Sequence, residues 1–294
     1  MIFINKILYQ FCNNQQKLRY GIFLFFIFQK NEIKRINIKQ DYLYGLNPTQ
    51  IALNANKRKI VELSLNESVK QNLPPKIANI INIAQQKEIP INYMKRDKLD
   101  KLVKHQPHQN VIIKCEPLKY IRINSSDIFQ GKIIVFLDQI TDPQNFGAIL
   151  RTCFYLGVDN VVVEESKRCP LNSTVSKTSS GAMELMDIFC TSNSVEFIKE
   201  CQKLKWKVFA CGVNFGQNNK QISLDKLKLN IVIILGSEGS GVNKELSNQA
   251  DKILYINQSI YFEKPIVFPN TLVDSLNVNS AASIIIENIK RQMF

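Results

Sequence analysis

The stretch "DPQNFGAILRTCFYLGVDNVVV", from Asp142 to Val163, has the apolar pattern of a helix followed by a buried strand. The helical spacing predicts one buried stripe, which consists of Phe146, Ile149, Leu150, Cys153 and Phe154. Arg151 lies off this stripe, beside the small residues Gly147 and Ala148 on the helix surface. Such small neighbours leave space for a ligand against the helix backbone. Arg151 is therefore either a ligand-binding group or a solvated surface residue.

Asn145 stands at the predicted start of this helix. Its side-chain amide can either cap the helix or bind a substrate, because an asparagine oxygen accepts hydrogen bonds from the first backbone N–H groups of a helix. The sequence leaves both roles open.

A second stretch, "IVIILGSEGSGVNKEL" from Ile231 to Leu246, leads from a buried strand through Gly236 and Glu238 into a helix. Glycines allow a ligand to approach the backbone closely, although a simple glycine turn would have the same residues. A carboxylate inside the loop repels phosphate. The loop therefore fits a ligand with hydroxyl or amine groups better than a nucleotide phosphate.

A third stretch, "DSLNVNSAASIIIENI" from Asp274 to Ile289, predicts another helix. Ser275 and Asn277 stand where it opens, and Ser275 is a natural N-cap residue. The small residues of its first turns permit either tight helix packing or a cofactor lying against the helix.

The rest of the chain alternates between helical and strand patterns from Tyr42 onward. Continuous apolar runs such as "KIIVFL" (132–137) are typical of strands buried on both faces. We expect the helix of the first stretch to run through Leu156 and another helix near residues 174–186. The pattern predicts an α/β fold with a mostly parallel sheet, preceded by a smaller α/β domain.

Positive charge is concentrated in the N-terminal part of the chain. Residues 1–130 hold 21 Lys and Arg against 9 Asp and Glu, a net charge of +12, whereas the remainder holds 17 against 16, a net of +1. This distribution favours a polyanionic partner such as RNA. A basic surface that serves only solubility is the alternative.

The first 40 residues are basic, and Glu32 is their only acidic residue. They predict a mitochondrial transit peptide rather than a secretory signal, with a cytoplasmic protein as the alternative. The run "GIFLFFIF" (21–28) is too short to span a bilayer, so no membrane attachment is expected. The seven scattered cysteines indicate a reducing compartment, and neither they nor the two histidines have the spacing of a metal site.

Taken in order, the three stretches resemble the motifs of the SpoU family of RNA ribose 2′-O-methyltransferases, within the SPOUT superfamily. The segment "YGLNPTQIAL … PHQNVIIKCEPL" is similar to the small RNA-binding domain that precedes the catalytic domain in that family. The resemblance implies a transit peptide over residues 1–40, an RNA-binding domain over 41–118, a linker over 119–131 and a catalytic domain over 132–294.

The resemblance also implies a parallel sheet with a deep C-terminal trefoil knot, S-adenosylmethionine bound in that knot, and a homodimer. Carried over to this chain, it places Asn145, Arg151, Glu238, Ser275 and Asn277 at the reaction centre. The cofactor is expected to meet the backbone at Gly236, Ile256 and Leu276.

The combination of leader, small domain and three motifs resembles the mitochondrial large-subunit rRNA methyltransferases, which modify a guanosine ribose. A tRNA target and a non-catalytic RNA-binding assembly factor of the same fold are the alternatives. A Rossmann-type nucleotide-dependent enzyme is a further alternative, although the glycine loop falls late in the domain rather than after its first strand.

Overall fold

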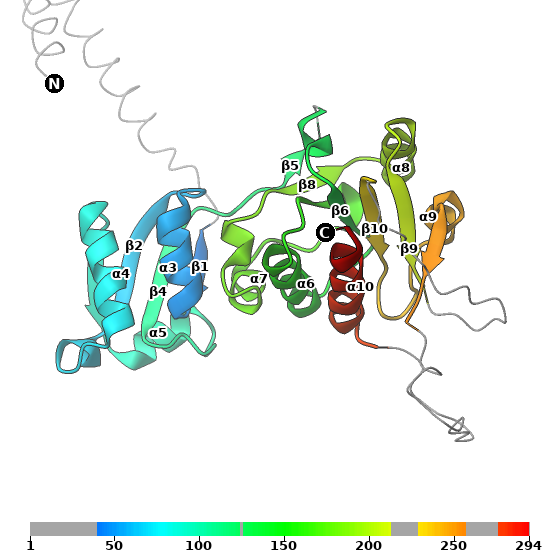
Figure 1. Ribbon diagram of the computed structural model, residues 1–294. Coiled ribbons are helices and arrows are strands. Elements are labelled where there is room, and N and C mark those ends of the chain that lie inside the picture. The colour runs from blue at the N-terminus through cyan, green and yellow to red at the C-terminus, as the bar shows by residue number, and fades with distance from the viewer. Residues whose placement is uncertain (1–39, 124–125, 213–228, 257–275, 294) are drawn as a thin grey trace, which may run out of the picture. The chain divides into compact units, whose positions relative to one another are not determined.

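The computed structural model describes residues 40–123, 126–212, 229–256 and 276–293. These residues build one four-stranded and one seven-stranded sheet, each covered by helices (Figure 1). The leader predicted over residues 1–40 lies outside the described residues, apart from Gln40.

The four-stranded unit has the strand order β1-β4-β2-β3. Strand β4 runs antiparallel to both neighbours, and β2 and β3 are parallel. Helices α3 and α4 supply buried residues such as Leu53 and Ile80 to one core of this unit, and Leu99 of α5 lies in a separate apolar cluster. Its elements are β1 (Asp41–Tyr44), α3 (Leu46–Ala55), β2 (Ile60–Asn66), η1 (Glu67–Lys70), α4 (Pro75–Gln86), β3 (Ile91–Met94), α5 (Arg96–Leu102) and β4 (Val111–Cys115).

The seven-stranded sheet has the order β11-β9-β10-β6-β7-β8-β5, and all its described pairs are parallel, as predicted for the larger domain. Its strands are β5 (Ile121–Arg122), β6 (Ile133–Leu137), β7 (Asn160–Glu164), β8 (Ile188–Thr191), β9 (Lys207–Cys211), β10 (Ile231–Leu235) and β11 (Lys252–Leu254). Its helices are η2 (Ser126–Phe129), α6 (Pro143–Tyr155), η3 (Glu165–Lys167), α7 (Ser173–Thr178), η4 (Ala182–Glu184), α8 (Ser194–Lys203), α9 (Lys244–Gln249) and α10 (Val278–Met293).

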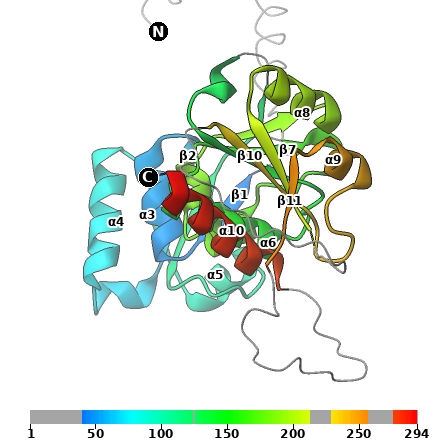
Figure 2. The same cartoon turned by 45° about the vertical axis from the view of Figure 1, so that its right-hand side comes forward.

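Alternate residues of each central strand face two different cores. Ile133 and Val135 of β6 join the buried residues of α6, α7 and α10, whereas Ile134 and Phe136 join those of α8 and α9. Strand β6 is therefore buried on both faces, which explains its uninterrupted apolar sequence. Figure 2 shows α10 beside α6 on one side of the sheet and α8 and α9 on the other.

Two details of the sequence prediction are wrong. The helix expected near 174–186 ends at Thr178, because Ser180 and Gly181 adopt positive φ angles of 53° and 92° and turn the chain into the short helix η4. Phe154 was expected in the buried stripe but is 48% exposed, because it lies at the edge of that stripe, about 80° around the helix axis from Phe146.

Part of the segment predicted as a linker belongs to the larger sheet. Strand β5 pairs in parallel with β8, and Ile128 is buried in the core that α8 and α9 cover. The predicted domain boundaries remain predictions, and so does the knot, because residues 257–275 lie outside the described residues.

Candidate active site

The sheet topology brings two of the three sequence motifs to the same place. Strands β6 and β10 are parallel neighbours, and Leu137 at the end of one is in register with Leu235 at the end of the other. The loop into α6 and the loop over residues 236–243, called the glycine loop below, therefore leave the sheet side by side, at its carboxyl edge. Helix α10, which carries the third motif, packs along α6 (Figure 1).

Three predicted site residues, one from each motif, form a hydrogen-bonded cluster. The side-chain amide of Asn277 donates to Oδ1 of Asn145 over 3.1 Å and also to Oε1 of Glu238. The other side of the Asn277 side chain is also used, because its Oδ1 accepts from the backbone N–H of Asn279 over 3.0 Å. The start of α10 thus fixes the direction in which the Asn277 amide points.

The capping of α6 removes one of the two roles that were left open for Asn145. Asp142 is the N-cap, and its Oδ2 accepts from the backbone N–H of Asn145 over 2.8 Å. The Asn145 side chain is consequently not needed for capping, and it points to Asn277 instead. A half-buried asparagine with this freedom is available for a substrate.

Arg151 is exposed on α6, six residues and about 9 Å along the helix axis from Asn145. Within the described part of the chain its guanidinium forms no hydrogen bond or ion pair. Five N–H donors are therefore available to an anionic group outside this chain.

Gly147, expected to leave space for a ligand, has a packing role instead. A Cβ atom at this position would lie 2.9 Å from both Cβ of Thr178 and the carbonyl oxygen of Val175. The missing side chain is what allows α7 to approach α6. The interpretation of Gly147 as part of a ligand surface is wrong.

The glycine loop closes on its own first residue. A Cβ atom on Gly236 would lie 2.1 Å from the backbone of Gly241 and Val242, and Ser237 bridges to Gly241. Gly239 and Gly241, by contrast, have open space where a side chain would be. The backbone is therefore accessible at the tip of the loop rather than at Gly236.

This surface fits S-adenosylmethionine as a cofactor. Accessible backbone at Gly239 and Gly241 stands near the Glu238 carboxylate, which suits a ligand with amine and hydroxyl groups. Leu276, which is 49% exposed and precedes Asn277, adds an apolar surface, and Ile256 is half-buried at the edge of the core. Ser275 lies outside the described residues. The assignment of Gly236, Ile256 and Leu276 to the cofactor stays a prediction.

One buried residue beside the cluster was missed from the sequence. Asp138 follows β6 directly and is 1% exposed, and its Oδ2 accepts from the backbone N–H of Asn243 over 2.6 Å. It therefore ties the end of the glycine loop to the end of β6, four residues before the first motif begins. A carboxylate immediately after a buried strand was the available signal. Its other oxygen, Oδ1, is buried with no hydrogen-bond partner among the described residues.

Comparison with known proteins identifies the class of enzyme that carries such a site. The SpoU rRNA Methylase family matches residues 132–287, and the family described as RNA 2′-O ribose methyltransferase substrate binding matches residues 42–121. The chain belongs to the SpoU rRNA Methylase family, whose members are S-adenosylmethionine-dependent RNA ribose methyltransferases. This confirms the enzyme class predicted from the sequence and excludes the Rossmann-type alternative.

Among individual relatives, the chain is 32% identical to human "rRNA methyltransferase 1, mitochondrial", covering 86% of this chain and 73% of that protein. It is 26% identical to the protein of the same name in Saccharomyces cerevisiae, covering 85% and 69%. It is also 26% identical to "23S rRNA (guanosine-2'-O-)-methyltransferase RlmB" of Vibrio vulnificus, covering 87% and 98%.

Solved structures show the same fold. An rRNA methyltransferase from Sinorhizobium meliloti, crystallised with AdoMet, superposes with a TM-score of 0.67 at 20% identity, over 88% of this chain and 90% of that one. The SpoU methyltransferase AviRb from Streptomyces viridochromogenes, also in complex with AdoMet, gives a TM-score of 0.67 at 15% identity, over 88% and 93%. At these identities the likeness concerns the fold alone.

Proposed function

We propose that the chain transfers the methyl group of S-adenosylmethionine to the ribose 2′-hydroxyl of a guanosine in mitochondrial large-subunit rRNA. The observation that carries this proposal is the cluster of Asn145, Glu238 and Asn277 beside α6, on which Arg151 is exposed and has no partner among the residues that the structure describes. The names of the human, yeast and Vibrio relatives support the choice of rRNA and guanosine.

The residues of the site perform positioning and charge stabilisation. S-adenosylmethionine supplies a methyl group on a positively charged sulfur, and methyl transfer to an oxygen needs that oxygen held in line with the carbon–sulfur bond. Asn145 and Asn277 carry amide groups that can orient a ribose. Their mutual hydrogen bond and the bond to Glu238 hold these amides in a fixed direction before the substrate arrives.

Arg151 acts as a fixed cation in this proposal. A guanidinium keeps its proton in proteins and is not a base at neutral pH, so Arg151 stabilises the negative charge that develops on the ribose oxygen or binds an adjacent phosphate. The absence of a partner for Arg151 among the described residues supports this role, because a surface arginine paired with a carboxylate would have to break that pair first.

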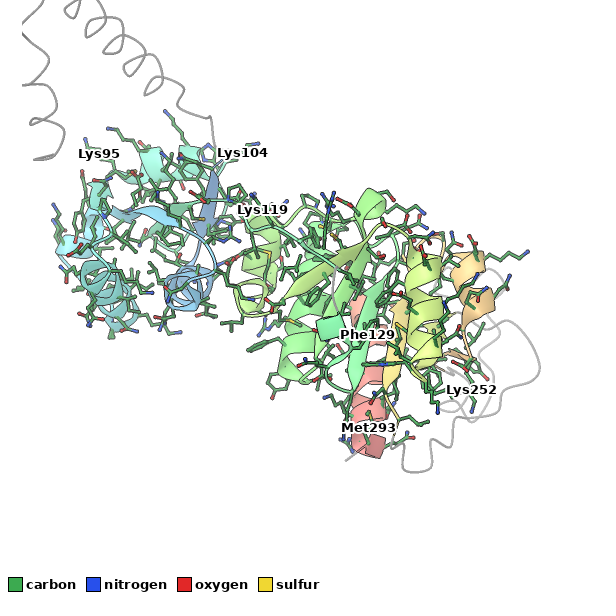
Figure 3. All side chains as sticks on the ribbon, turned by 90° about the horizontal axis from the view of Figure 1, so that it is seen from above. Lys95, Lys104, Lys119, Phe129, Lys252 and Met293 are labelled. Atoms are coloured by element: carbon green, nitrogen blue, oxygen red, sulfur yellow. The ribbon has the colours of Figure 1, made fainter. Side chains whose placement is uncertain are left out.

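The four-stranded unit supplies the RNA contacts. Residues 41–118 hold 12 Lys and Arg against 7 Asp and Glu, and five of these cations fall between Lys95 and Lys104, in and around α5. Lys95, Lys98, Lys101 and Lys104 are all exposed, and Figure 3 shows Lys95 and Lys104 along one edge of this unit. These four residues form an exposed lysine row. Such a row fits a phosphate backbone, which is recognised mainly through charge.

We assign the protein to mitochondria and expect it to be a homodimer. The location is supported by the basic leader and by the names of the human and yeast relatives. The dimer is supported by large apolar side chains that α6 and α10 expose, namely Phe154 at 48%, Tyr155 at 86% and Ile284 at 41%. None of the described helices is long and apolar enough to cross a membrane.

Two measurements test this function. Transfer of labelled methyl groups from S-adenosylmethionine to transcribed rRNA by the purified protein separates an enzyme from a non-catalytic assembly factor. Mapping of ribose methylation in mitochondrial RNA from cells that lack the protein then identifies the target. We expect the loss of one guanosine mark in the large rRNA. Loss confined to a tRNA, with all rRNA marks intact, would contradict the proposal.

A further inference from the structure

A buried ion pair joins the four-stranded unit to the seven-stranded unit. Arg58, just after α3, donates from Nε to Oε2 of Glu184 and from Nη2 to Oε1 of the same carboxylate, each over 2.9 Å. The two side chains are 1% and 0% exposed. This is the two-point geometry in which an arginine holds a carboxylate in a single orientation.

Neighbouring groups satisfy the remaining hydrogen-bonding capacity of the pair. Ser176 donates from Oγ to Oε1 of Glu184 over 3.2 Å, and Nη1 of Arg58 donates to the carbonyl oxygen of Glu116 over 3.2 Å and lies 3.4 Å from Oδ2 of Asp41. Burial raises the pKa of the Glu184 carboxyl, although Arg58 beside it acts in the opposite direction. A buried pair of this kind adds little net stability. Its main effect is to hold Arg58 and Glu184, and the segments that carry them, in one relative orientation.

The acidic partner belongs to the segment that supports the catalytic helix. Residues 173–184 form α7 and η4, and α7 is the helix that α6 approaches through Gly147. The same segment contacts the four-stranded unit at a second point, where Gly181 leaves room for Ile51 of α3. One short segment thus touches both the helix that carries Arg151 and the unit that carries the lysine row.

We propose that Arg58 and Glu184 are positioning residues for the RNA substrate. They fix the four-stranded unit against the segment 173–184, so that RNA bound to the lysines reaches Arg151 and the Asn145 cluster in one orientation. This inference rests on the proposed function, since it requires that the four-stranded unit binds the RNA. The pair does not touch the reacting atoms and acts only through the placement of the two units.

Suitable variants remove both charges of the pair together, and the nearby Asp41 carboxylate keeps a side chain that is 16% exposed. The double variant Arg58→Met/Glu184→Leu replaces both groups by apolar side chains of similar size, which proteins often tolerate. Arg58→Lys retains the charge and loses the two-point contact. Lys57→Ala is the matched control, because Lys57 forms an exposed ion pair with Asp187 in the same region, with side chains 29% and 56% exposed.

The main readout is methyl transfer by the full chain, resolved into separate constants. We expect the double variant to bind S-adenosylhomocysteine within twofold of the wild type and the rRNA fragment within threefold, because both binding surfaces are intact. We expect kcat to fall tenfold or more, since bound RNA is no longer held over the site. Arg58→Lys should fall between the wild type and the double variant, and Lys57→Ala should match the wild type.

A second readout measures the placement directly. Spin labels introduced as unnatural amino acids at the exposed positions Gln85 and Lys203 report the distance between the units. We expect one narrow distribution in the wild type and a broad one in the double variant. If wild-type protein fails to methylate rRNA, the proposed function is wrong, and these distances still decide whether the pair fixes the units.

Three results would overturn the proposal. The first is an unchanged kcat together with an unchanged distance distribution in the double variant. The second is a loss of kcat in the double variant that equals its loss of S-adenosylhomocysteine binding sites, because equal losses indicate misfolding. The third is an equal loss of kcat in Lys57→Ala.

Discussion

Asn277 donates a hydrogen bond of 3.1 Å to Asn145, although 132 residues separate the two in the chain. The bond links the beginnings of α10 and α6, and the same amide also reaches Glu238 on the glycine loop. Because Oδ1 of Asn277 caps α10 through Asn279, the capping oxygen and the donating nitrogen of one side chain can be tested separately.

The variant Asn277→Asp makes this separation. Aspartate keeps the oxygen that caps α10 but loses the donor and places a second carboxylate beside Glu238. We expect kcat to fall by about 100-fold, the usual effect of losing one preorganised polar group, with little change in Tm. Steady-state methyl transfer and thermal unfolding measure the two effects. Asn288→Asp, at an exposed position of the same helix, is the control, and near-normal activity of Asn277→Asp would refute the role of the amide.

Arg151→Ala should abolish methyl transfer while binding of S-adenosylhomocysteine stays within a few-fold of the wild type. The guanidinium has no partner in the described part of the chain, so its removal leaves no buried group unsatisfied and should not unfold the protein. Calorimetry and a turnover assay measure the two quantities. Retained activity would show that Arg151 is only a surface residue. Arg291→Ala, on the exposed side of α10, controls for loss of one positive charge.

Substitution by alanine should lower the Tm at one glycine of the glycine loop and leave it unchanged at another. Gly236→Ala places a Cβ atom 2.1 Å from the backbone of Gly241 and Val242, which cannot move aside as a flexible side chain would, so we expect a loss of several degrees in Tm. Gly239→Ala meets no atom within 4 Å and should leave Tm unchanged. Equal melting temperatures for the two variants would contradict the closed loop. Activity of Gly239→Ala then reports whether a ligand uses the open backbone.

Alkaline pH should destabilise the protein through its buried thiols. Burial raises the pKa of both Cys153 and Cys201 to about 12, whereas an unfolded cysteine ionises near pH 8.5. A group whose pKa is raised in the folded state lowers the free energy of unfolding as the pH increases above the pKa of the unfolded state. Each such thiol therefore costs up to about 1.4 kcal/mol per pH unit above pH 8.5.

Denaturant unfolding at pH 7.5, 9 and 10 measures this decline. The variant Cys201→Ala should show a shallower decline than the wild type, even if its stability at pH 7.5 is lower because of the lost side chain. A decline that is equally steep in the variant would mean that other groups govern the alkaline behaviour.

Neutralising the lysine row should weaken the salt dependence of RNA binding. Changing Lys95, Lys98, Lys101 and Lys104 to glutamine removes up to four phosphate contacts, and each contributes about 0.7 to the slope of log K against log salt for single-stranded RNA. Filter binding at several salt concentrations gives the slope. Changing Lys199 and Lys203 of α8 to glutamine is the control on the other unit. An unchanged slope in the fourfold variant would place the RNA elsewhere.

Much of the fold could be predicted from local patterns. The apolar run of β6 and the helical stripe of α6 follow from periodicity, and the structure confirms the run and, apart from Phe154, the stripe. The break after Thr178 could not be predicted, because Gly181 is required by Ile51, a residue distant in the sequence. For the same reason, the sequence could not show that Gly147 serves α7 rather than a ligand.

The site itself was only partly predictable. Resemblance pointed to Asn145, Glu238 and Asn277, and the structure brings these three together. Periodicity alone could not show which side chain capped α6, since both Asp142 and Asn145 can cap. Asp138 was missed because its significance depends on Asn243, which lies 105 residues further along the chain.

The order of the motifs along the chain has a consequence during protein synthesis. A nascent chain that has emerged as far as β10 can already build α6 and the central strands, but it lacks the amide of Asn277 that joins Asn145 to Glu238. The cluster can form only after α10 has left the ribosome and packed on α6. If the four-stranded unit binds RNA as proposed, an unfinished chain can hold RNA before its methylation site is complete.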